Sequence, residues 1–256
     1  MKKLIMVFLA AGLLSGCANV APIPEYESAR QIERKNTELI NLPAPSQEVV
    51  VAVYGFADKT GQRKPSDRLA NISFAVTQGA EAVLIETLQH ASDGKFFKVV
   101  ERVGLENLVK ERQIIRQTRQ SVGDQRELPP MLFAGVIIEG GIIGYDSNTL
   151  TGGAGARYLG IGPTTQYRQD IVTINLRVVS VQTGQVLISV STTKTIVSIG
   201  NSLTFFRFYD MGTRSAEAEI GYTVNEPVNY AVRTAIETAV VEVVMQGEQR
   251  GFWDFK

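Results

Sequence analysis

The residues with the clearest potential for chemistry form a glycine-rich stretch, "TGGAGARYLGIGP", at residues 151–163. Closely spaced glycines can cradle a phosphate when their backbone amides converge at the start of a helix. Here Tyr158 stands where a dinucleotide-binding fingerprint has its third glycine, no Lys-Ser or Lys-Thr pair follows, and no helical period comes next. A nucleotide-binding enzyme is therefore one hypothesis for the chain, and saturable nucleotide binding would support it.

Other catalytic sets are absent from the sequence. The one histidine, His90, falls at the end of a predicted helix, where a capping or solvent-facing role is expected. A single histidine excludes a histidine-rich metal site, and neither G-x-S-x-G nor H-E-x-x-H occurs. Glu237 and Glu242 are interpreted as the solvent face of the last helix. We therefore expect no enzyme activity, no metal and no bound cofactor.

The only cysteine, Cys17, ends the motif "LSGC". It follows "MKK" and the apolar run Leu4–Leu14, which is shorter than the roughly 20 residues that a membrane-spanning helix needs. This arrangement resembles a bacterial lipobox, in which the thiol receives a diacylglycerol and the amine a palmitate after cleavage. The alternative is an incidental cysteine near an ordinary signal site. We predict a signal peptide at 1–16 and a covalent lipid on Cys17.

Acylation would hold the chain at a membrane, since each buried methylene contributes about 0.8 kcal/mol. Ala18 follows the cysteine, where an aspartate would favour retention at the inner membrane, so the outer membrane is expected. The 26 basic and 26 acidic residues cancel, and removal of Lys2 and Lys3 leaves 24 against 26, a charge of −2. This balance predicts no nucleic-acid partner.

The elements that must position any site alternate between strands and helices, after a proline-containing tether at 17–48. Period-two and 3.6-residue apolar patterns predict an α/β body. Gly140 and Gly141 suggest a β-bulge, and Gly247 is expected to end the last helix. The predicted strands are 48–56, 95–102, 132–145, 170–181 and 186–197, and the predicted helices are 73–91, 104–121 and 225–247. The second helix carries a stripe of Leu105, Leu108, Arg112, Ile115 and Arg119.

Two stretches fit this body poorly, 149–169 and 198–222. In the first, small or apolar residues alternate with a polar set that includes Arg157; in the second, Glu217 and Glu219 occupy the polar set. Strands of about nine residues suit a membrane-spanning hairpin, although two long soluble hairpins are the alternative. Open sheet edges in lipid cost several kcal/mol for each unpaired group, so insertion would require several copies to pool their hairpins into a ring.

Short segments along nearly the whole chain carry a family resemblance. The chain resembles the curli secretion channels, outer-membrane lipoproteins of bacteria that make extracellular amyloid fibres. The segments are "LPAP" (42–45), "TGQ.KP" (60–65), "ER.GL.NL..ER.IIR" (101–116), "IIGY.SN" (142–148), "GG.GARY.GIG" (152–162), "NLRVV" (175–179), "TKTI" (193–196), "FRF" (206–208) and "GYT.NEPV" (221–228).

The resemblance implies an α/β periplasmic domain, a mixed sheet with flanking helices, that contributes two β-hairpins per subunit to an oligomeric transmembrane β-barrel. The ring is typically a nonamer. The implied segments are the first part of the periplasmic domain at 49–149, transmembrane hairpin 1 at 150–169, periplasmic strands at 170–197, transmembrane hairpin 2 at 198–222, and the C-terminal helix and tail at 223–256.

The resemblance also implies a function and partners. Unfolded curli-type fibre subunits would pass from periplasm to cell surface by ATP-independent diffusion, assisted by periplasmic and surface curli accessory proteins. The alternative is an outer-membrane-anchored periplasmic lipoprotein that acts as a binding or assembly module without a pore of its own.

The family narrows its channel with a loop that corresponds to residues 58–73, where a tyrosine, an asparagine and a phenylalanine form stacked rings. Asn71 matches the asparagine, Ile72 stands in place of the phenylalanine, and Ser66 or Asp67 occupies the region of the tyrosine. The resemblance therefore implies a constriction that grips aromatic side chains less strongly. Glu217, Glu219 and Arg157 are expected to face the channel lumen, where carboxylate rings would favour cations.

Overall fold

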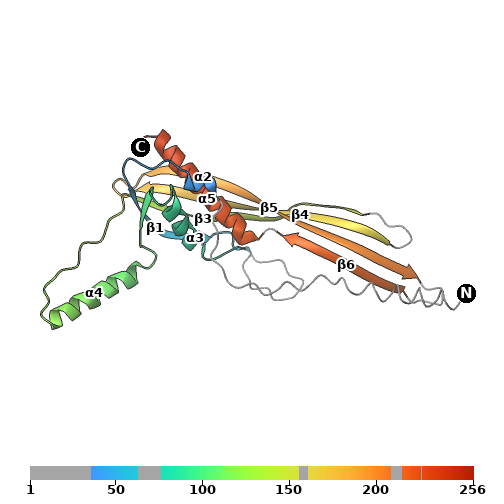
Figure 1. The fold of residues 1–256 in the computed structure, drawn as a ribbon, viewed down its shortest axis with the longest axis horizontal. Coiled ribbons are helices and arrows are strands. Elements are labelled where there is room, and N and C mark those ends of the chain that lie inside the picture. The colour runs from blue at the N-terminus through green and yellow to red at the C-terminus, as the bar shows by residue number, and fades with distance from the viewer. Residues whose placement is uncertain (1–35, 63–75, 156–160, 209–214, 226) are drawn as a thin grey trace, which may run out of the picture. The chain divides into compact units, whose positions relative to one another are not determined.

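The computed structural model describes residues 36–62, 76–155, 161–208, 215–225 and 227–256, and all of these belong to one unit. Its centre is a six-stranded sheet with the order β2-β1-β3-β4-β5-β6 (Figure 1). β1 runs parallel to β2 and β3, and the remaining neighbours are antiparallel. The strands are β1 (Val49–Asp58), β2 (Phe97–Val100), β3 (Val136–Gly155), β4 (Ile161–Ser180), β5 (Val186–Phe208) and β6 (Ser215–Asn225).

Helices α3 (Ala80–His90) and α5 (Val228–Gln249) pack on one face of this sheet (Figure 1). The Arg233 guanidinium lies 2.9 Å from the Glu86 carboxylate and joins the two helices. Beneath them, alternate residues of each strand form the core, because successive side chains of a strand point to opposite faces. In β4 the core residues are Val172, Ile174, Leu176 and Val178, all fully buried. The mixed sheet with flanking helices confirms the predicted α/β body.

Helix α3 starts later than the sequence predicts. Its apolar stripe is confirmed, since Ala80, Leu84 and Leu88 are fully buried, but the helix begins at Ala80 and not at 73. Gly79 is the N-cap residue, and the Thr77 hydroxyl accepts a hydrogen bond from its backbone N–H at 3.2 Å. This local turn competes with helix formation, as threonine side chains commonly do before a helix starts.

The expected bulge lies beside Gly140, but on the neighbouring strand. Val53 pairs with Ile138 and Phe56 with Gly140, so β1 carries the extra residue. Gly140 and Gly141 meet a different need: a Cβ on either would collide with a backbone carbonyl, of Asn175 or of Ala57. The two glycines therefore allow close approach of neighbouring strands.

The last helix confirms its predicted apolar stripe but not its predicted end. Gly247 lies inside α5, which continues to Gln249. A glycine is needed at this position because the indole of Trp253 packs where a Cβ would stand. The residue in the left-handed conformation is Gly251, with φ of 71°. Glu237 corrects a second expectation: it is 8% exposed and does not belong to a solvent face, whereas Glu242 is exposed.

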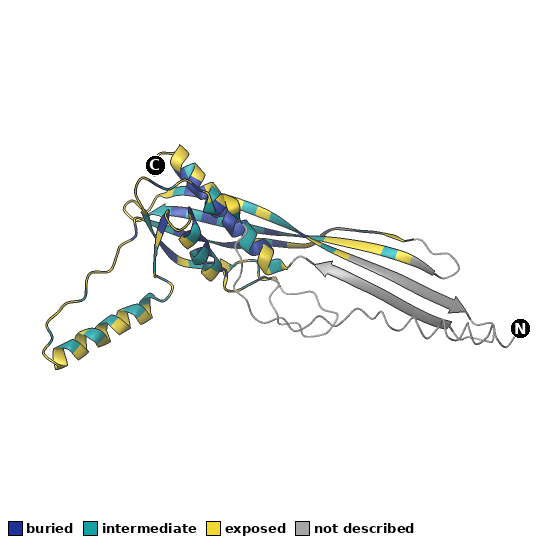
Figure 2. Ribbon diagram, in the orientation of Figure 1, coloured by how far each residue is buried: buried dark blue, intermediate teal, exposed yellow. Residues whose placement is uncertain are grey.

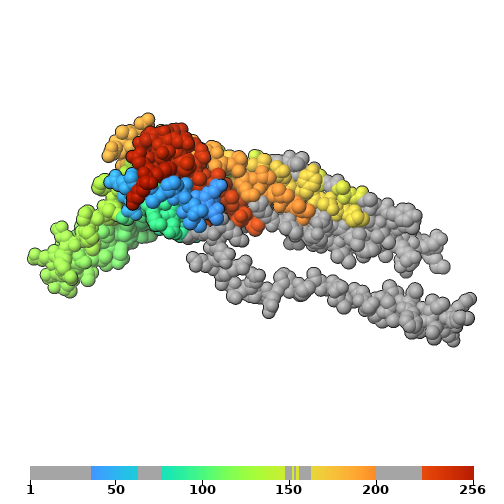
Figure 3. All heavy atoms as spheres, turned by 45° about the horizontal axis from the view of Figure 1, so that its top comes forward, coloured from blue at the N-terminus to red at the C-terminus, as the bar shows by residue number. Residues whose placement is uncertain are grey.

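The two ends of this unit lie together (Figure 3). The backbone N–H of Ser46 donates to the carbonyl of Asp254 at 2.7 Å, and Pro45 and Phe255 form an isolated bridge. Phe96 packs edge-on against Trp253, with ring centroids 5.8 Å apart. Burying such aromatic surface stabilises the closure between the segment before β1 and the C-terminus.

Helix α4 (Leu105–Ser121) differs from the other helices, because none of its residues is buried. Figure 2 shows exposed and half-buried residues along its whole length. The helix confirms the predicted bounds, and the half-buried residues from 105 to 119 are those of the predicted stripe: Leu105, Leu108, Arg112, Ile115 and Arg119.

Candidate functional site

Three strands continue far beyond the part of the sheet that the helices cover. β3 and β4 have 20 residues each and β5 has 23, whereas strands of globular proteins usually have 3–10. The sequence divides each into a body strand and a hairpin strand, but the structure makes them continuous. We call the outer parts of these three strands, together with the whole of β6, the strand extensions: residues 147–155 of β3, 161–169 of β4, 198–208 of β5 and 215–225 of β6.

The burial pattern changes abruptly where the β4 extension begins. From Asp170 to Val178 every second residue is buried. Of residues 163–169, whose side chains the structure describes, none is buried (Figure 2). Tyr167 is 42% exposed. Nothing in the described part of the chain covers either face of this ribbon, so its stability depends on backbone pairing within the sheet.

A buried polar cluster, which we call the neck cluster, marks this boundary. The carboxylate of Asp170 is 2% exposed and accepts hydrogen bonds from the Tyr145 hydroxyl at 3.2 Å and from the Arg168 guanidinium at 3.1 Å. Burial, together with the negative charge and hydrogen bond of Asp170, raises the pKa of the Tyr145 hydroxyl. Both groups are partnered, so the cluster anchors the strands where they leave the core.

The extensions keep a regular antiparallel register. Tyr167 lies opposite Gly152 on β3 and opposite Ile199 on β5. The Tyr167 ring occupies the place where a Cβ of Gly152 would stand, so the glycine accommodates the ring. Cross-strand neighbours of this kind fix register, because a shift by one residue would reverse the face of every side chain.

Two edges of the ribbon lack a strand partner within the described chain. β1 pairs with β3 only as far as Ile142, so the β3 extension is bonded on one side alone, by β4. β6 pairs with β5 and with no other described strand. Edge strands present rows of unpaired N–H and C=O groups, which are a template for pairing with another chain.

The segment expected to form the constriction is rooted beside the extensions. The carboxylate of Asp58 accepts hydrogen bonds from the Thr60 backbone N–H at 2.8 Å and from the Gln78 amide at 3.0 Å. Asp58 therefore ties together the two ends of the segment. The Lys59 N–H also donates to the carbonyl of Ile142, at the level where β3 continues beyond β1.

Most of the predicted site residues lie outside the described residues. Glu217 and Glu219 lie in β6 with their backbone only, opposite Phe206 and Thr204. The structure therefore does not bring the predicted side chains together or separate them. The residues outside are Cys17, Ser66, Asp67, Asn71, Ile72 and Arg157.

Other site types can be surveyed within the described ranges. There, no group of three or more His, Cys, Asp or Glu side chains could hold a metal ion. None of the helices in the same ranges is long and apolar enough to cross a membrane. The Nδ1 of His90 donates a hydrogen bond to the Glu86 carbonyl at 2.6 Å, in the last turn of α3.

The sequence did not predict the neck cluster or the hydrogen bonds of Asp58 to Thr60 and Gln78, which we call the Asp58 anchor. Their members are separated by 25 residues in the first case and 20 in the second, so no local spacing connects them. The only signal was a charged residue, Asp170, at the start of an otherwise apolar alternation.

The geometry defines a class of protein: an α/β domain whose sheet continues beyond its core as an antiparallel ribbon, with two edges that no other described strand pairs. Residues 33–256 match the family described as "Curli production assembly/transport component CsgG", and the chain belongs to this family. Its relatives of that name from Citrobacter koseri, Escherichia coli K12 and Salmonella typhimurium are each 42% identical, over 98% of this chain and 91% of theirs.

Among solved structures, the PelC dodecamer from Paraburkholderia phytofirmans is similar to 78% of this chain and 91% of its own. The TM-score is 0.33 and the identity 12%. A similarity this low carries no inference about assembly.

Proposed function

We propose that this protein is an outer-membrane secretion channel through which unfolded curli-type fibre subunits pass from periplasm to cell surface. Membership of the curli production assembly and transport family supports a role in curli secretion. The observation that carries the pore is the set of strand extensions, which leave the core and are covered by nothing in the described chain. Transport is by diffusion without ATP, and the chain acts as a conduit and not as an enzyme.

The lengths of the extensions support membrane insertion. A tilted strand needs about 9–11 residues to cross the hydrocarbon layer. The β3 and β4 extensions each supply nine residues, 147–155 and 161–169, and the β5 and β6 extensions supply eleven each, 198–208 and 215–225. Each pair forms one transmembrane hairpin, centred on the expected 150–169 and 198–222.

The two free edges support a ring. In lipid, an unpaired backbone group costs several kcal/mol, so a ribbon with open edges cannot insert alone. The β3 edge of one subunit pairs with the β6 edge of the next, which closes an oligomeric transmembrane β-barrel. By resemblance to the family, we expect this ring to be a nonamer.

The loop between β1 and α3 narrows the channel. Its root at Asp58, Lys59 and Gln78 lies at the end of the sheet from which the extensions depart. Asn71 and Ile72, with Ser66 and Asp67, form the constriction, while Glu217, Glu219 and Arg157 line the lumen of the barrel above it.

The remaining parts follow from the same assembly. Cys17 carries diacylglycerol and palmitate, which anchor the chain in the outer membrane after removal of residues 1–16, and no other cofactor takes part. Residues 17–48 tether the lipid to a large periplasmic domain, where curli accessory proteins bind. Surface accessory proteins act at the other end of the barrel.

Single-channel recording of the lipidated protein in a planar bilayer tests the proposal. We expect discrete, uniform conductance steps that become smaller in Asn71→Trp, because a larger ring of side chains narrows the loop. A matched enlargement far from the loop, Ser189→Trp on the exposed face of β5, should leave the steps unchanged.

One result would contradict the channel, and another would contradict only the constriction. Silence from an intact lipidated oligomer would rule out the pore and favour a periplasmic binding module that lacks a pore of its own. Equal conductance of the wild type and Asn71→Trp would place the constriction elsewhere.

A further inference from the structure

Helix α4 and the chain that follows it form a groove that the channel function does not use. Gly123, with φ of 72°, turns the chain back after the helix. The Arg112 guanidinium then donates to the carbonyl of Pro129 at 2.6 Å, and Arg119 donates to the carbonyl of Arg126 at 2.8 Å. The returning segment 123–130 is therefore held along the helix, and a groove of about 610 Å³ lies between them.

The groove, which we call the arginine groove, carries a net positive charge. Four arginines line it, Arg112, Arg116, Arg119 and Arg126, against two carboxylates. Three of these arginines recur at helical spacing, so their side chains emerge from one face of α4. The acidic lining residues are Asp124 and Glu127.

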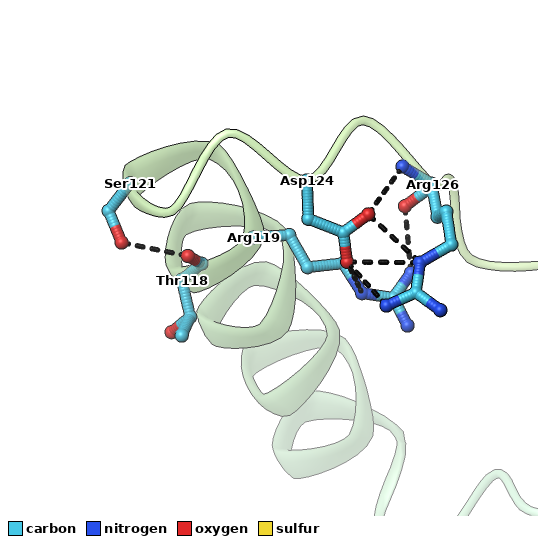
Figure 4. Close-up of polar contacts among 5 residues, drawn as sticks. All are labelled: Thr118, Arg119, Ser121, Asp124 and Arg126. Carbon is cyan, nitrogen blue, oxygen red and sulfur yellow. Dashed lines mark hydrogen bonds and ion pairs between the residues drawn. The ribbon is translucent and has the colours of Figure 1, made fainter.

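One carboxylate in the groove already shows how it holds an acid. Asp124 lies between two guanidinium groups: that of Arg126 donates to its oxygens at 2.8 and 2.9 Å, and the Nε of Arg119 is 3.9 Å away (Figure 4). Hydrogen bonds from Arg126 lower the pKa of the Asp124 carboxyl. Asp124 therefore pairs with Arg119 and Arg126 but, among the described residues, makes no hydrogen bond or ion pair with the other two arginines, Arg112 and Arg116.

The side chain of Arg116 has no hydrogen bond or ion pair within the part of the chain that the structure describes, and it is exposed. Arg112, one turn before it, donates one hydrogen bond to the carbonyl of Pro129. A guanidinium offers five donors in a planar fork that matches a carboxylate. The lining thus contains one free arginine and one partly free arginine, side by side on the helix.

We propose that the arginine groove binds an acidic peptide segment of a protein partner, with Arg116 as the principal contact and Arg112 beside it. The size of the groove favours a peptide over a single ion, since it is roughly 20 times the volume of a water molecule, about 30 Å³. Charged contacts of this kind also speed association and select partners by sign.

The place of the groove in the fold suits a docking site. Segment 123–130 leads into β3 at Val136, and the β3 extension ends 20 residues later at Gly155. Because a strand rises about 3.3 Å per residue, Val136 and Gly155 lie at opposite ends of β3. The segment that forms the groove therefore joins the sheet at the end remote from the extensions. Under the proposed function this end is periplasmic, but the groove and its ligand do not depend on conductance.

Titration of the full lipidated protein in detergent with a fluorescent hexaglutamate peptide tests this proposal. We expect saturable binding that weakens by about tenfold in Arg116→Glu, as expected for the loss of a charge-assisted bidentate contact. Lys95→Glu changes the charge equally at an exposed site outside the groove and should alter the affinity less than about twofold. Hexalysine should not bind.

Four outcomes would overturn the proposal. The first is an equal affinity of Arg116→Glu and Lys95→Glu for hexaglutamate, and the second is no binding at all. The third is a changed oligomer mass of Arg116→Glu with unchanged peptide binding, which would make the occupant a second copy of this chain. Competition by inorganic phosphate at the affinity of the peptide would reduce the site to an ion site. Each result is obtained without channel recording, so this proposal and the channel can fail separately.

Discussion

At the scale of single residues, the neck cluster depends most strongly on its hydrogen bonds, because it contains a buried carboxylate. Asp170 is almost fully buried, and a buried carboxylate persists only where hydrogen bonds replace its lost hydration. Asp170→Ala leaves the Tyr145 hydroxyl without this acceptor, so the free energy of unfolding should fall by about 1–3 kcal/mol. Tyr145→Phe should cost about 1 kcal/mol, because Arg168 still partners Asp170.

Urea unfolding followed by the fluorescence of the single tryptophan, Trp253, measures both changes. The double variant should lose less than the sum of the two, since the residues share one interaction. Glu48→Ala removes an exposed ion pair with Lys98 and serves as the control, with a change below about 0.5 kcal/mol. Additive losses would show that the Tyr145–Asp170 hydrogen bond contributes nothing.

The same cluster predicts a dependence on alkaline pH. The pKa of Tyr145 is raised in the folded protein, so its protonated form is the one that folding favours. This contribution is complete below the ordinary tyrosine pKa of about 10 and is lost as pH rises through the higher folded value. The stability advantage of the wild type over Tyr145→Phe should therefore shrink above pH 10.

Urea midpoints at pH 8 and pH 10.5 measure this effect. Tyr54→Phe, at an exposed position on β1, is the matched control and should keep the alkaline loss of the wild type. An advantage over Tyr145→Phe that is constant with pH would mean that the Tyr145 hydroxyl does not titrate differently in the folded state.

At the scale of elements, helix α5 depends on the absence of a side chain. Alanine is a better helix former than glycine by about 1 kcal/mol, but a Cβ at Gly247 would displace the Trp253 ring. The indole would lose its 2.9 Å hydrogen bond to the Val244 carbonyl and its packing on Phe96. Gly247→Ala should therefore destabilise the protein by about 1–3 kcal/mol, measured by thermal unfolding.

Gly79→Ala separates this steric effect from the general effect of glycine. Gly79 has open space around its Cβ position and a negative φ, so the substitution should change stability by a few tenths of a kcal/mol. An equal or greater loss in Gly79→Ala would contradict the steric explanation for Gly247.

The loop anchor at Asp58 makes a prediction about the channel. Asp58→Ala removes the hydrogen bonds that hold Thr60 and Gln78, so both ends of the loop gain freedom. Open-channel current should become noisier and step sizes less uniform, with a stability loss of about 1–2 kcal/mol. Gln78→Ala removes only the bond across the loop and should have a smaller effect. Steps as uniform as those of the wild type would separate the anchor from the constriction.

Elements with a strong period were predictable, and features set by distant contacts were not. The stripe at Leu84 and Leu88 and the alternation from Val172 to Val178 each face one core, so the local pattern carries the information. The extra residue on β1 depends on its pairing with β3, which is far away in the sequence. The start of α3 and the end of α5 depend on the Thr77–Gly79 turn and on Trp253, which are near in sequence but are not part of the apolar period.

The candidate site was predictable in outline only. The alternation around Tyr167 marked a strand that fits the body poorly, and the structure places it in a ribbon without cover. That three of the extensions, in β3, β4 and β5, continue core strands was missed, because the sequence change at Asp170 resembles a boundary between elements. The chemistry of the constriction, at Asn71 and Ile72, stays a prediction.

At the scale of the whole molecule, a closed ring of subunits would pair the backbone groups at both edges of the ribbon. A single ribbon leaves backbone groups unpaired along β3 and β6, whereas a closed ring pairs them all. In such a ring, alternate residues of each extension face lipid and lumen. Thr165 and Tyr167 would face lipid, and Gln166 and Arg168 would face the water of the channel.

Cysteine labelling tests this alternation without interference, since the chain has only one native cysteine, Cys17, and acylation would block it. In liposomes, Gln166→Cys and Arg168→Cys should react with a charged maleimide at least about tenfold faster than Thr165→Cys and Tyr167→Cys, because lipid excludes the charged reagent. In urea all four should react alike, which controls for intrinsic reactivity. Equal rates at all four positions in liposomes would leave the ribbon in water and remove the barrel, whatever the size of the ring.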